Sequence, residues 1–278
     1  MLLLLLAIFS SSMISIVMRI SSDKISNNLS MLAVNYLVCS LLGAGYAGFD
    51  VIPLGAPGLS RTVGLGIIGG VLYLAGFVLH QRSLSRNGIV MTAIFNKLGL
   101  LVPITLSVVL FGEVPTWVQV FGFCIAVGAI ILINIQKSSG HSSLGLSLLI
   151  LLLVSGSAEA MAKVFDALGN VALSDLYLFY IFAVALVLCL ILVILKKERP
   201  GLWELLFGAL IGIPNFFSSK FLLGALRTLP AVVVYPTFSV ATMLVLTLTG
   251  VVMFRERLCR SRWIALGAII VALVLLNI

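Results

Sequence analysis

Long apolar segments, separated by short polar gaps, dominate the pattern of residues along this chain. Each segment has roughly the 20 apolar residues that an α-helix needs to cross the hydrocarbon core of a bilayer. The pattern predicts ten membrane-spanning helices, over residues 2–20, 31–49, 62–81, 88–111, 116–135, 144–163, 172–195, 203–224, 231–254 and 262–277. The gaps hold turn-forming residues such as Arg86-Asn87-Gly88, and none is long enough for a soluble domain.

The first apolar segment resembles a secretory signal peptide in its hydrophobicity. No basic residues precede it, no clear cleavage site follows, and the apolar character continues to Ile20. We therefore expect this segment to be the first transmembrane helix.

Composition supports the same class of protein. Hydrophobic residues make up 62% of the 278 residues and charged residues only 9%, whereas soluble domains contain roughly 25% charged residues. The net charge of +8 comes from short clusters such as Lys196-Lys197-Glu198-Arg199, which are typical of membrane topology signals and anionic lipid contacts. Nucleic acid is not an expected partner, because no basic stripe with interleaved aromatic residues is present.

A repeat relates the two halves of the chain. The segment Val108–Glu113 resembles Val251–Glu256, which lies 143 residues later, and the same offset relates Gly69 to Gly212 and Asn134 to Asn277. We predict two five-helix repeats, over residues 1–136 and 143–278. Because five crossings return the chain to the opposite face, the second repeat is expected to be inverted, as in many secondary transporters.

The end of each predicted repeat carries the residues of a family resemblance. Phe111-Gly112-Glu113 and Phe254-Arg255-Glu256 each place a glutamate between the fourth and fifth helix of a repeat, and Gly122, Gly128 and Gly267 follow in the next helices. This arrangement resembles the EamA-type family of the drug/metabolite transporter superfamily. The resemblance implies a ten-helix bundle around a central cavity and transport of a small metabolite without ATP.

The orientation in the membrane is left open by two conflicting indications. Most of the 17 Lys and Arg residues lie in or beside the odd-numbered gaps, which predicts cytoplasmic odd gaps and external termini. The family resemblance implies cytoplasmic termini.

Ionisable side chains within the predicted helices are the first candidates for a binding site. Lys97, preceded by Asn96, lies near the middle of the fourth helix, where an ammonium group would suit a substrate carboxylate or phosphate. Its alternative role is a structural cation paired with a buried acid. Glu159 is predicted either to accept a proton or pair with Lys97, or to form a local ion pair with Lys163 four residues later.

Polar and aromatic residues of other helices complete the predicted substrate site. Pro214 is expected to interrupt the eighth helix near Asn215 and Ser219, which lie one helical turn apart. The further candidates are Tyr235, Ser239, Tyr36 and Tyr73. The structural alternatives are a simple kink at Pro214 and an interfacial or packing role for the tyrosines.

The sequence predicts no cofactor, no metal site and no enzymatic activity. His80 and His141 have no ligand spacing, Cys39, Cys124, Cys189 and Cys259 form no CxxC pair, and no hydrolase motif is present. We predict a polytopic, all-α protein of the cell membrane that transports an amino-acid-like, anionic or zwitterionic solute by alternating access. A flippase for a lipid or polyprenyl phosphate is the alternative. The expected partners are the solute, membrane lipids and, as an open option, a second copy in a homodimer.

Overall fold

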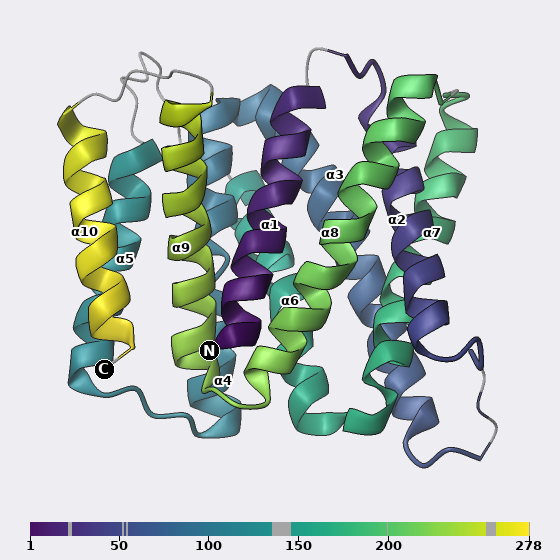
Figure 1. The fold of residues 1–278 in the computed structure, drawn as a ribbon, viewed down its shortest axis with the longest axis horizontal. Helices are drawn as coiled ribbons and strands as arrows, with labels where there is room; N and C mark the ends of the chain where they lie inside the picture. The colour runs from purple at the N-terminus through teal and green to yellow at the C-terminus, as the bar shows by residue number, and fades with distance from the viewer. Residues whose placement is uncertain are drawn as a thin grey trace. The chain divides into compact units, whose positions relative to one another are not determined.

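The computed structural model describes residues 1–21, 24–51, 53, 55–134, 146–198, 200–253 and 260–277 (Figure 1). These residues form helices and connecting turns, and no strand occurs among them. The helices are α1 (Leu2–Ser21), α2 (Asn28–Tyr46), α3 (Leu59–Leu98), α4 (Leu101–Phe111), α5 (Trp117–Asn134), α6 (Leu146–Leu168), the 3₁₀ helix η1 (Val171–Leu173), α7 (Ser174–Leu195), α8 (Leu202–Leu226), α9 (Ala231–Val252) and α10 (Arg260–Leu276). The prediction of an all-helical fold is confirmed.

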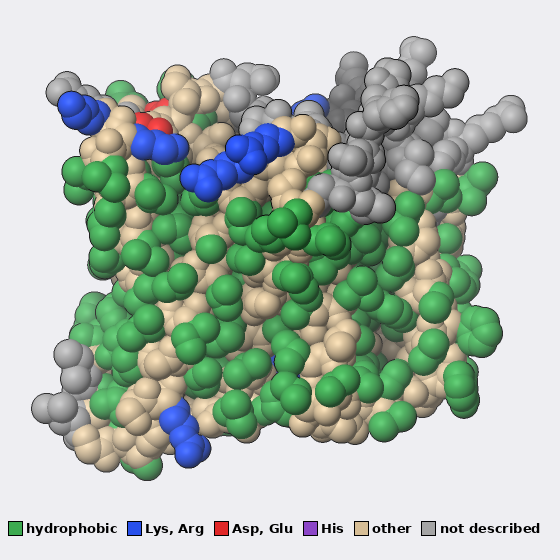
Figure 2. All heavy atoms as spheres, turned by 180° about the vertical axis from the view of Figure 1, so that it is seen from behind, with side chains coloured by type: hydrophobic (Ala, Val, Ile, Leu, Met, Phe, Trp, Pro, Cys, Tyr) green, Lys and Arg blue, Asp and Glu red, His purple; other side chains and the backbone are tan. Residues whose placement is uncertain are grey.

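Seven of the described helical stretches are long and apolar enough to cross a membrane. Shorter apolar helices cover Phe95–Phe111, Trp117–Leu132 and Leu266–Leu276. Figure 2 shows hydrophobic side chains over most of the displayed surface, with Lys and Arg only in small groups. An apolar surface of this kind is suited to contact with lipid tails, because apolar side chains need no hydrogen-bond partners there.

The predicted turn at Arg86-Asn87-Gly88 lies inside α3, which runs without a break in helical assignment from Leu59 to Leu98. Even so, α3 bends sharply there. The hydroxyl oxygens of Ser83 and Thr92 are 2.9 Å apart, although nine residues of a straight helix rise about 13.5 Å. Asn87 supports the bend, because its amide donates to Ser83 Oγ and to Ser147 Oγ of α6. The two arms of α3 therefore correspond to the third predicted helix and the start of the fourth.

The fourth predicted helix, 88–111, is interrupted within its length. The last arm of α3 ends at Leu98, a turn covers Gly99 and Leu100, and α4 begins at Leu101. The amides of Gly99 and Leu100 donate only to the carbonyl oxygens three residues earlier, at 3.2 and 3.4 Å. The other helices begin and end within a few residues of their predicted limits.

The chain forms two compact units, which we describe separately. Unit 1 contains Met1–Leu74 and Val164–Ala225, and unit 2 contains Ala75–Lys163 and Leu226–Ile278. Each unit takes helices from both halves of the sequence. The repeat boundaries 1–136 and 143–278 stay a prediction.

Glycines allow close helix packing in unit 1. On α3, a Cβ at Gly66 would lie 2.5 Å from Tyr180 Cβ, and one at Gly70 would lie 2.6 Å from the Ile181 carbonyl oxygen. Gly208 and Gly212 of α8 approach α2 in the same way. These pairs follow the GxxxG pattern, in which missing side chains let two helix backbones meet.

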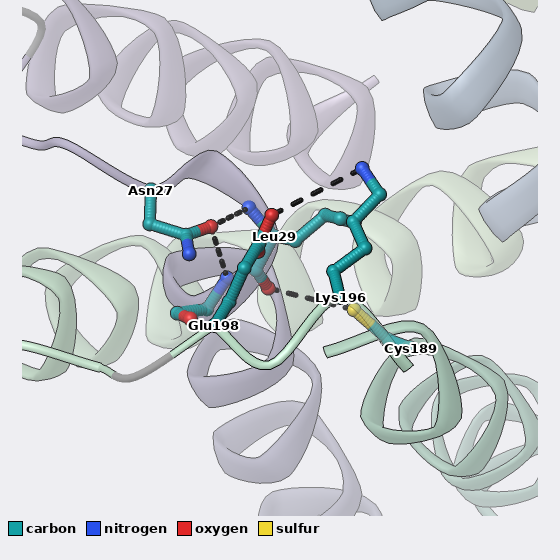
Figure 3. A network of polar contacts seen from close by, with 6 residues as sticks. Asn27, Leu29, Cys189, Lys196 and Glu198 are labelled. Atoms are coloured by element: carbon teal, nitrogen blue, oxygen red, sulfur yellow. Dashed lines mark hydrogen bonds and ion pairs between the residues drawn. The ribbon is translucent and has the colours of Figure 1, made fainter. Parts of the chain in front are cut away.

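A polar network at the start of α2 also stabilises unit 1 (Figure 3). The Asn27 side chain accepts hydrogen bonds from the amides of Leu29 and Ser30, which is the geometry of a helix N-cap. The Leu29 carbonyl oxygen accepts from the Cys189 thiol of α7 at 3.5 Å. Glu204 of α8 accepts from the amides of Ser26 and Asn27, at 2.9 and 3.3 Å. The first turn of α2 is therefore tied to both α7 and α8.

The core of unit 2 lies where α5, α9 and α10 meet. Fully buried apolar side chains from these helices and the α3–α4 turn form it, and they include Leu100, Ile130, Val240 and Ile269. A second cluster joins Phe95 of α3 to Leu148 of α6. This packing fixes the end of α3 against α6, the helix that carries Glu159.

Candidate functional site

Asn96 and Lys97 lie in the last turn of α3, next to the tightened turn at Gly99-Leu100 that precedes α4. Lys97 is half-buried in the last turn of α3, directly before the Gly99-Leu100 turn. It lies 11 residues after Arg86 at the bend and 14 residues before Phe111, so it is near the middle of this crossing. Interrupted helices in transporters provide backbone polar groups and a flexible point for substrate binding.

Two glycines bring this interruption against α6. The Gly99 carbonyl oxygen lies so close to Gly156 that a Cβ at Gly156 would collide with it, and that Cβ would also meet Val102. Glu159 follows Gly156 by less than one turn of α6. The close backbone contact therefore sets the distance between Lys97 and Glu159.

The Glu159 carboxyl group interacts electrostatically with Lys97. Its side chain is exposed, although it lies midway along α6. An acid and a base in the middle of two apolar helices are costly to keep in a membrane, so such residues usually have a functional role or a partner.

Tyr235 of α9 lies beside the same part of α6. Its hydroxyl group donates to the Glu159 carbonyl oxygen at 3.0 Å, and its side chain is buried. Ser239 is one turn further along α9 and is also buried. Of the predicted substrate residues, Lys97, Asn96, Tyr235 and Ser239 thus belong to unit 2, together with Glu159.

His80 is a further ionisable residue that the fold brings toward Lys97. It lies on the first arm of α3, and the bend of α3 returns Lys97 into electrostatic range of its imidazole. The buried Nδ1 of His80 has no hydrogen-bond partner among the described residues. The sequence held no signal for this contact, because 17 residues separate His80 from Lys97 and only the bend brings them together.

Lys163 has a carboxylate partner other than the predicted Glu159. Its Nζ lies 2.7 Å from Glu113 Oε1, and the Phe111 ring is 5.8 Å away. The other oxygen of Glu113 accepts from the Val232 amide in the first turn of α9, where a helix favours negative charge. Gly112, in the left-handed region at φ 66°, ends α4 and turns the chain toward this contact. Phe111-Gly112-Glu113 therefore links α4, α6 and α9, whereas Phe254-Arg255-Glu256 lies outside the described residues.

The predicted tyrosines Tyr36 and Tyr73 lie in unit 1, around Phe182 of α7. Their ring centroids are 6.3 and 6.0 Å from the Phe182 centroid, and Tyr36 is buried. Their role in substrate binding stays a prediction.

The predicted polar positions of α8 also lie in unit 1. Asn215 Nδ2 donates to Oδ1 of the buried Asn35 at 3.2 Å, and Ser219 is half-buried one turn later. The helix remains continuous through Pro214, so the discontinuity is at Gly99-Leu100 and not at this proline. The Cys39 thiol donates to the Gly212 carbonyl oxygen at 3.2 Å, which supplies a partner for backbone near Pro214.

Lys220 was missed by sequence reasoning as an interior residue. Its Nζ lies 2.7 Å from Asp175 Oδ1 of α7 and 3.4 Å from the centroid of the Tyr46 ring. A carboxylate and an aromatic face together offset the cost of placing an ammonium group in an apolar helix. Lys220 thus joins α8 to α2 and α7.

No group of three or more metal-ligating side chains occurs in the part of the chain that the structure describes. His141 and Cys259 lie outside that part. Lys97 interacts electrostatically with both Glu159 and His80, and these ionisable groups suit the binding of charged solutes.

Comparison with known proteins places these features in a family. An uncharacterized protein of Haemophilus influenzae is 21% identical over 274 residues, which cover 95% of this chain and 93% of the relative. A protein of known crystal structure superposes with a TM-score of 0.73 at 17% identity, over 99% of this chain and 94% of its own. These likenesses indicate a shared fold along nearly the whole chain.

The sequence model of the EamA-like transporter family matches residues 1–135. That range contains the bend of α3, the interruption beside Lys97 and the Phe111-Gly112-Glu113 motif. The match of the family model confirms the resemblance seen in the sequence. Together with the seven apolar helices, it indicates an integral membrane protein. Residues 1–135 of this chain match the EamA-like transporter family, which is a family of the drug/metabolite transporter superfamily.

Proposed function

We propose that this chain is a secondary transporter of the cell membrane that carries a small zwitterionic metabolite, such as an amino acid, by alternating access. Lys97 would bind the carboxylate of the solute and Glu159 its ammonium group. The observation that carries the proposal is the close packing of Gly99, two residues after Lys97, on Gly156 of α6, three residues before Glu159. A site with one charge of each sign discriminates against solutes that have only one, because such a solute leaves one of the two site charges without a partner.

An architecture of ten crossings in two inverted repeats is part of this proposal. Helices five positions apart in the chain pack on each other: α2 with α7 in unit 1, and α4 with α9 and α5 with α10 in unit 2. A pseudo-twofold axis that exchanges the halves produces pairs of this kind.

The glycine contacts of unit 1 support the same symmetry in detail. Gly66 faces the Tyr177 carbonyl oxygen and Tyr180 Cβ, while Gly208 faces the Met31 carbonyl oxygen and Val34 Cβ. In both contacts, the residue that contributes the carbonyl oxygen precedes the residue that contributes the Cβ by three positions, from 177 to 180 on α7 and from 31 to 34 on α2.

The second glycine of each pair continues this correspondence. Gly70 faces the Ile181 carbonyl oxygen and Val184 Cβ, while Gly212 faces the Asn35 carbonyl oxygen and Val38 Cβ. The α3–α7 contact therefore has a matching α8–α2 contact. Alternating access in inverted-repeat transporters uses such matched contacts, since either half can adopt the conformation of the other.

The test begins with the substrate. The purified protein is screened by thermal shift against amino acids and against matched amines and carboxylates that carry a single charge, since a bound ligand stabilises the native state by mass action. Zwitterions are expected to raise the melting temperature more than either analogue. Equal shifts for amines alone, or for carboxylates alone, would contradict a two-charge site.

The residue test uses uptake of the best ligand into proteoliposomes. Lys97→Ala and Glu159→Gln are each expected to lower the transport rate at least about tenfold, because each leaves a substrate charge unpaired. Lys24→Ala is the matched control, since Lys24 lies 4.7 Å from the Trp203 ring in unit 1. Transport at the wild-type rate by Lys97→Ala would show that Lys97 does not bind the solute.

A further inference from the structure

A basic cavity in unit 2 lies apart from the Lys97–Glu159 site. It has a volume of about 230 Å³ and is lined by Leu79, Arg82, Ser83, Arg86, Ser147 and Ile150. Arg82 and Arg86 are four residues apart on α3, so both guanidinium groups project from one face of the helix. Ser147 faces them from the first turn of α6.

We propose that this cavity binds a phosphate group, as a phosphodiester of an anionic lipid or as a free phosphate. Two guanidinium groups supply planar pairs of N–H donors, which match the oxygen atoms of a phosphate better than an ammonium group does. Ser83 adds a hydroxyl group from α3, and Ser147 adds one from α6 on the opposite wall. The described residues that line the cavity include two arginines and no acidic residue.

The hydroxyl groups are held in place by the bend of α3. Asn87 Nδ2 lies 3.1 Å from Ser83 Oγ and 3.3 Å from Ser147 Oγ, so one amide links the two walls. Ser83 is also 2.9 Å from the Thr92 hydroxyl. A preorganised set of donors loses less entropy when it binds an anion than freely rotating side chains do.

The size and position of the cavity favour a headgroup over a whole metabolite. Drug-sized ligands occupy cavities of roughly 300–1,000 Å³, so about 230 Å³ suits a single phosphate group with its nearest substituents. A bend between two apolar helical arms belongs at a membrane face, where lipid phosphates are found. Leu79 and the exposed Ile150 are apolar neighbours for the start of an acyl chain.

The experiment uses the full-length protein and two probes. In the first arm, the melting temperature is measured in vesicles of phosphatidylcholine alone and with added phosphatidylglycerol. In the second arm, inorganic phosphate is titrated into the detergent-solubilised protein. Stabilisation by phosphatidylglycerol alone assigns the site to lipid, and stabilisation by phosphate assigns it to a soluble anion; each supports the phosphate site. No stabilisation in either arm overturns it.

Variants distinguish binding in this cavity from binding to positive charge elsewhere on the surface. Arg82→Gln and Arg86→Gln are each expected to weaken binding of the effective probe about tenfold, because each removes a charged donor. Arg61→Gln is the matched control, since Arg61 is an exposed arginine of the same helix that does not line the cavity. Unchanged binding by both cavity variants, or an equal loss by Arg61→Gln, overturns the proposal.

A third variant tests the cavity without changing either arginine, in case the arginine variants misfold. Ser147→Ala keeps both positive charges and is expected to weaken binding of the effective probe about threefold, through loss of one hydrogen bond. Wild-type binding should also weaken as salt increases, since both arginines are exposed to screening. If neither Ser147→Ala nor added salt weakens binding of the probe, the proposed phosphate site is contradicted. The proposal does not depend on transport, because the Lys97 variants are expected to keep this cavity intact.

Discussion

Lys163 and Lys220 are ammonium groups within apolar helices, and each has a carboxylate oxygen 2.7 Å away. Neither carboxylate is on the same helix as its lysine. Glu113 precedes α5 and Asp175 is at the start of α7, so each ion pair fixes a connection between helices. Such pairs fix the positions of helices more than they add net stability, because the cost of removing two charges from water offsets most of their attraction.

Removing one partner of such a pair leaves the other charge uncompensated. We expect Glu113→Gln to lower the free energy of unfolding by about 3 kcal/mol, because Lys163 is largely buried and loses its carboxylate. Chemical denaturation of the purified protein measures this change. Lys196→Gln is the control, since the Lys196–Glu198 pair is 4.0 Å long and Lys196 is exposed, and its effect should stay below about 1 kcal/mol. Equal effects of the two variants would contradict a structural role for Glu113.

The sequence predicted the charged candidates at this scale but not all of their partners. Lys97 and Glu159 stand out because ionisable residues are rare inside apolar segments. Their mutual contact was one of two alternatives, since Lys163 is also one helical turn from Glu159. The contact between Lys163 and Glu113 joins residues 50 positions apart and leaves no local pattern in the sequence.

At the scale of the element, the helices were predictable where hydrophobic length alone determines them. The interruption at Gly99-Leu100 was not predicted, because the apolar pattern continues across it and Pro103 can be accommodated in the first turn of α4. Pro214 does not interrupt α8, contrary to the expectation from the sequence. The helix α8 continues through the proline and packs closely on α2 at Gly208 and Gly212.

The glycine contacts lead to a prediction about helix packing. Gly70→Ala and Gly212→Ala are each expected to destabilise the protein by about 1–3 kcal/mol, because the new Cβ would meet a backbone carbonyl oxygen and a valine of the facing helix. Gly64→Ala is the control on α3, since a Cβ there meets open space and alanine favours a helix by about 0.5–1 kcal/mol. Melting temperatures of the three variants provide the measurement. Similar losses in the first two would support matched contacts, and a loss in only one would contradict them.

At the scale of the whole chain, the bend of α3 determines how many times the chain crosses the membrane. If the arms before Ser83 and after Thr92 are separate crossings, the chain crosses ten times, and five crossings belong to each repeat. If α3 crosses only once, the number is nine and the repeats cannot be inverted copies. The 2.9 Å contact between Ser83 and Thr92 favours two arms.

Topology labelling distinguishes these two arrangements. In a variant without the native cysteines, Asp50→Cys follows the second crossing and Lys196→Cys follows the seventh, and both positions are exposed. With ten crossings, a membrane-impermeant thiol reagent should reach these two cysteines from opposite faces, and tags on the two termini should share a face. With nine crossings, both cysteines would react from one face and the termini would lie on opposite faces. The first result is expected, because only an even total, divided into two odd repeats, gives inverted halves that can exchange conformations across the membrane.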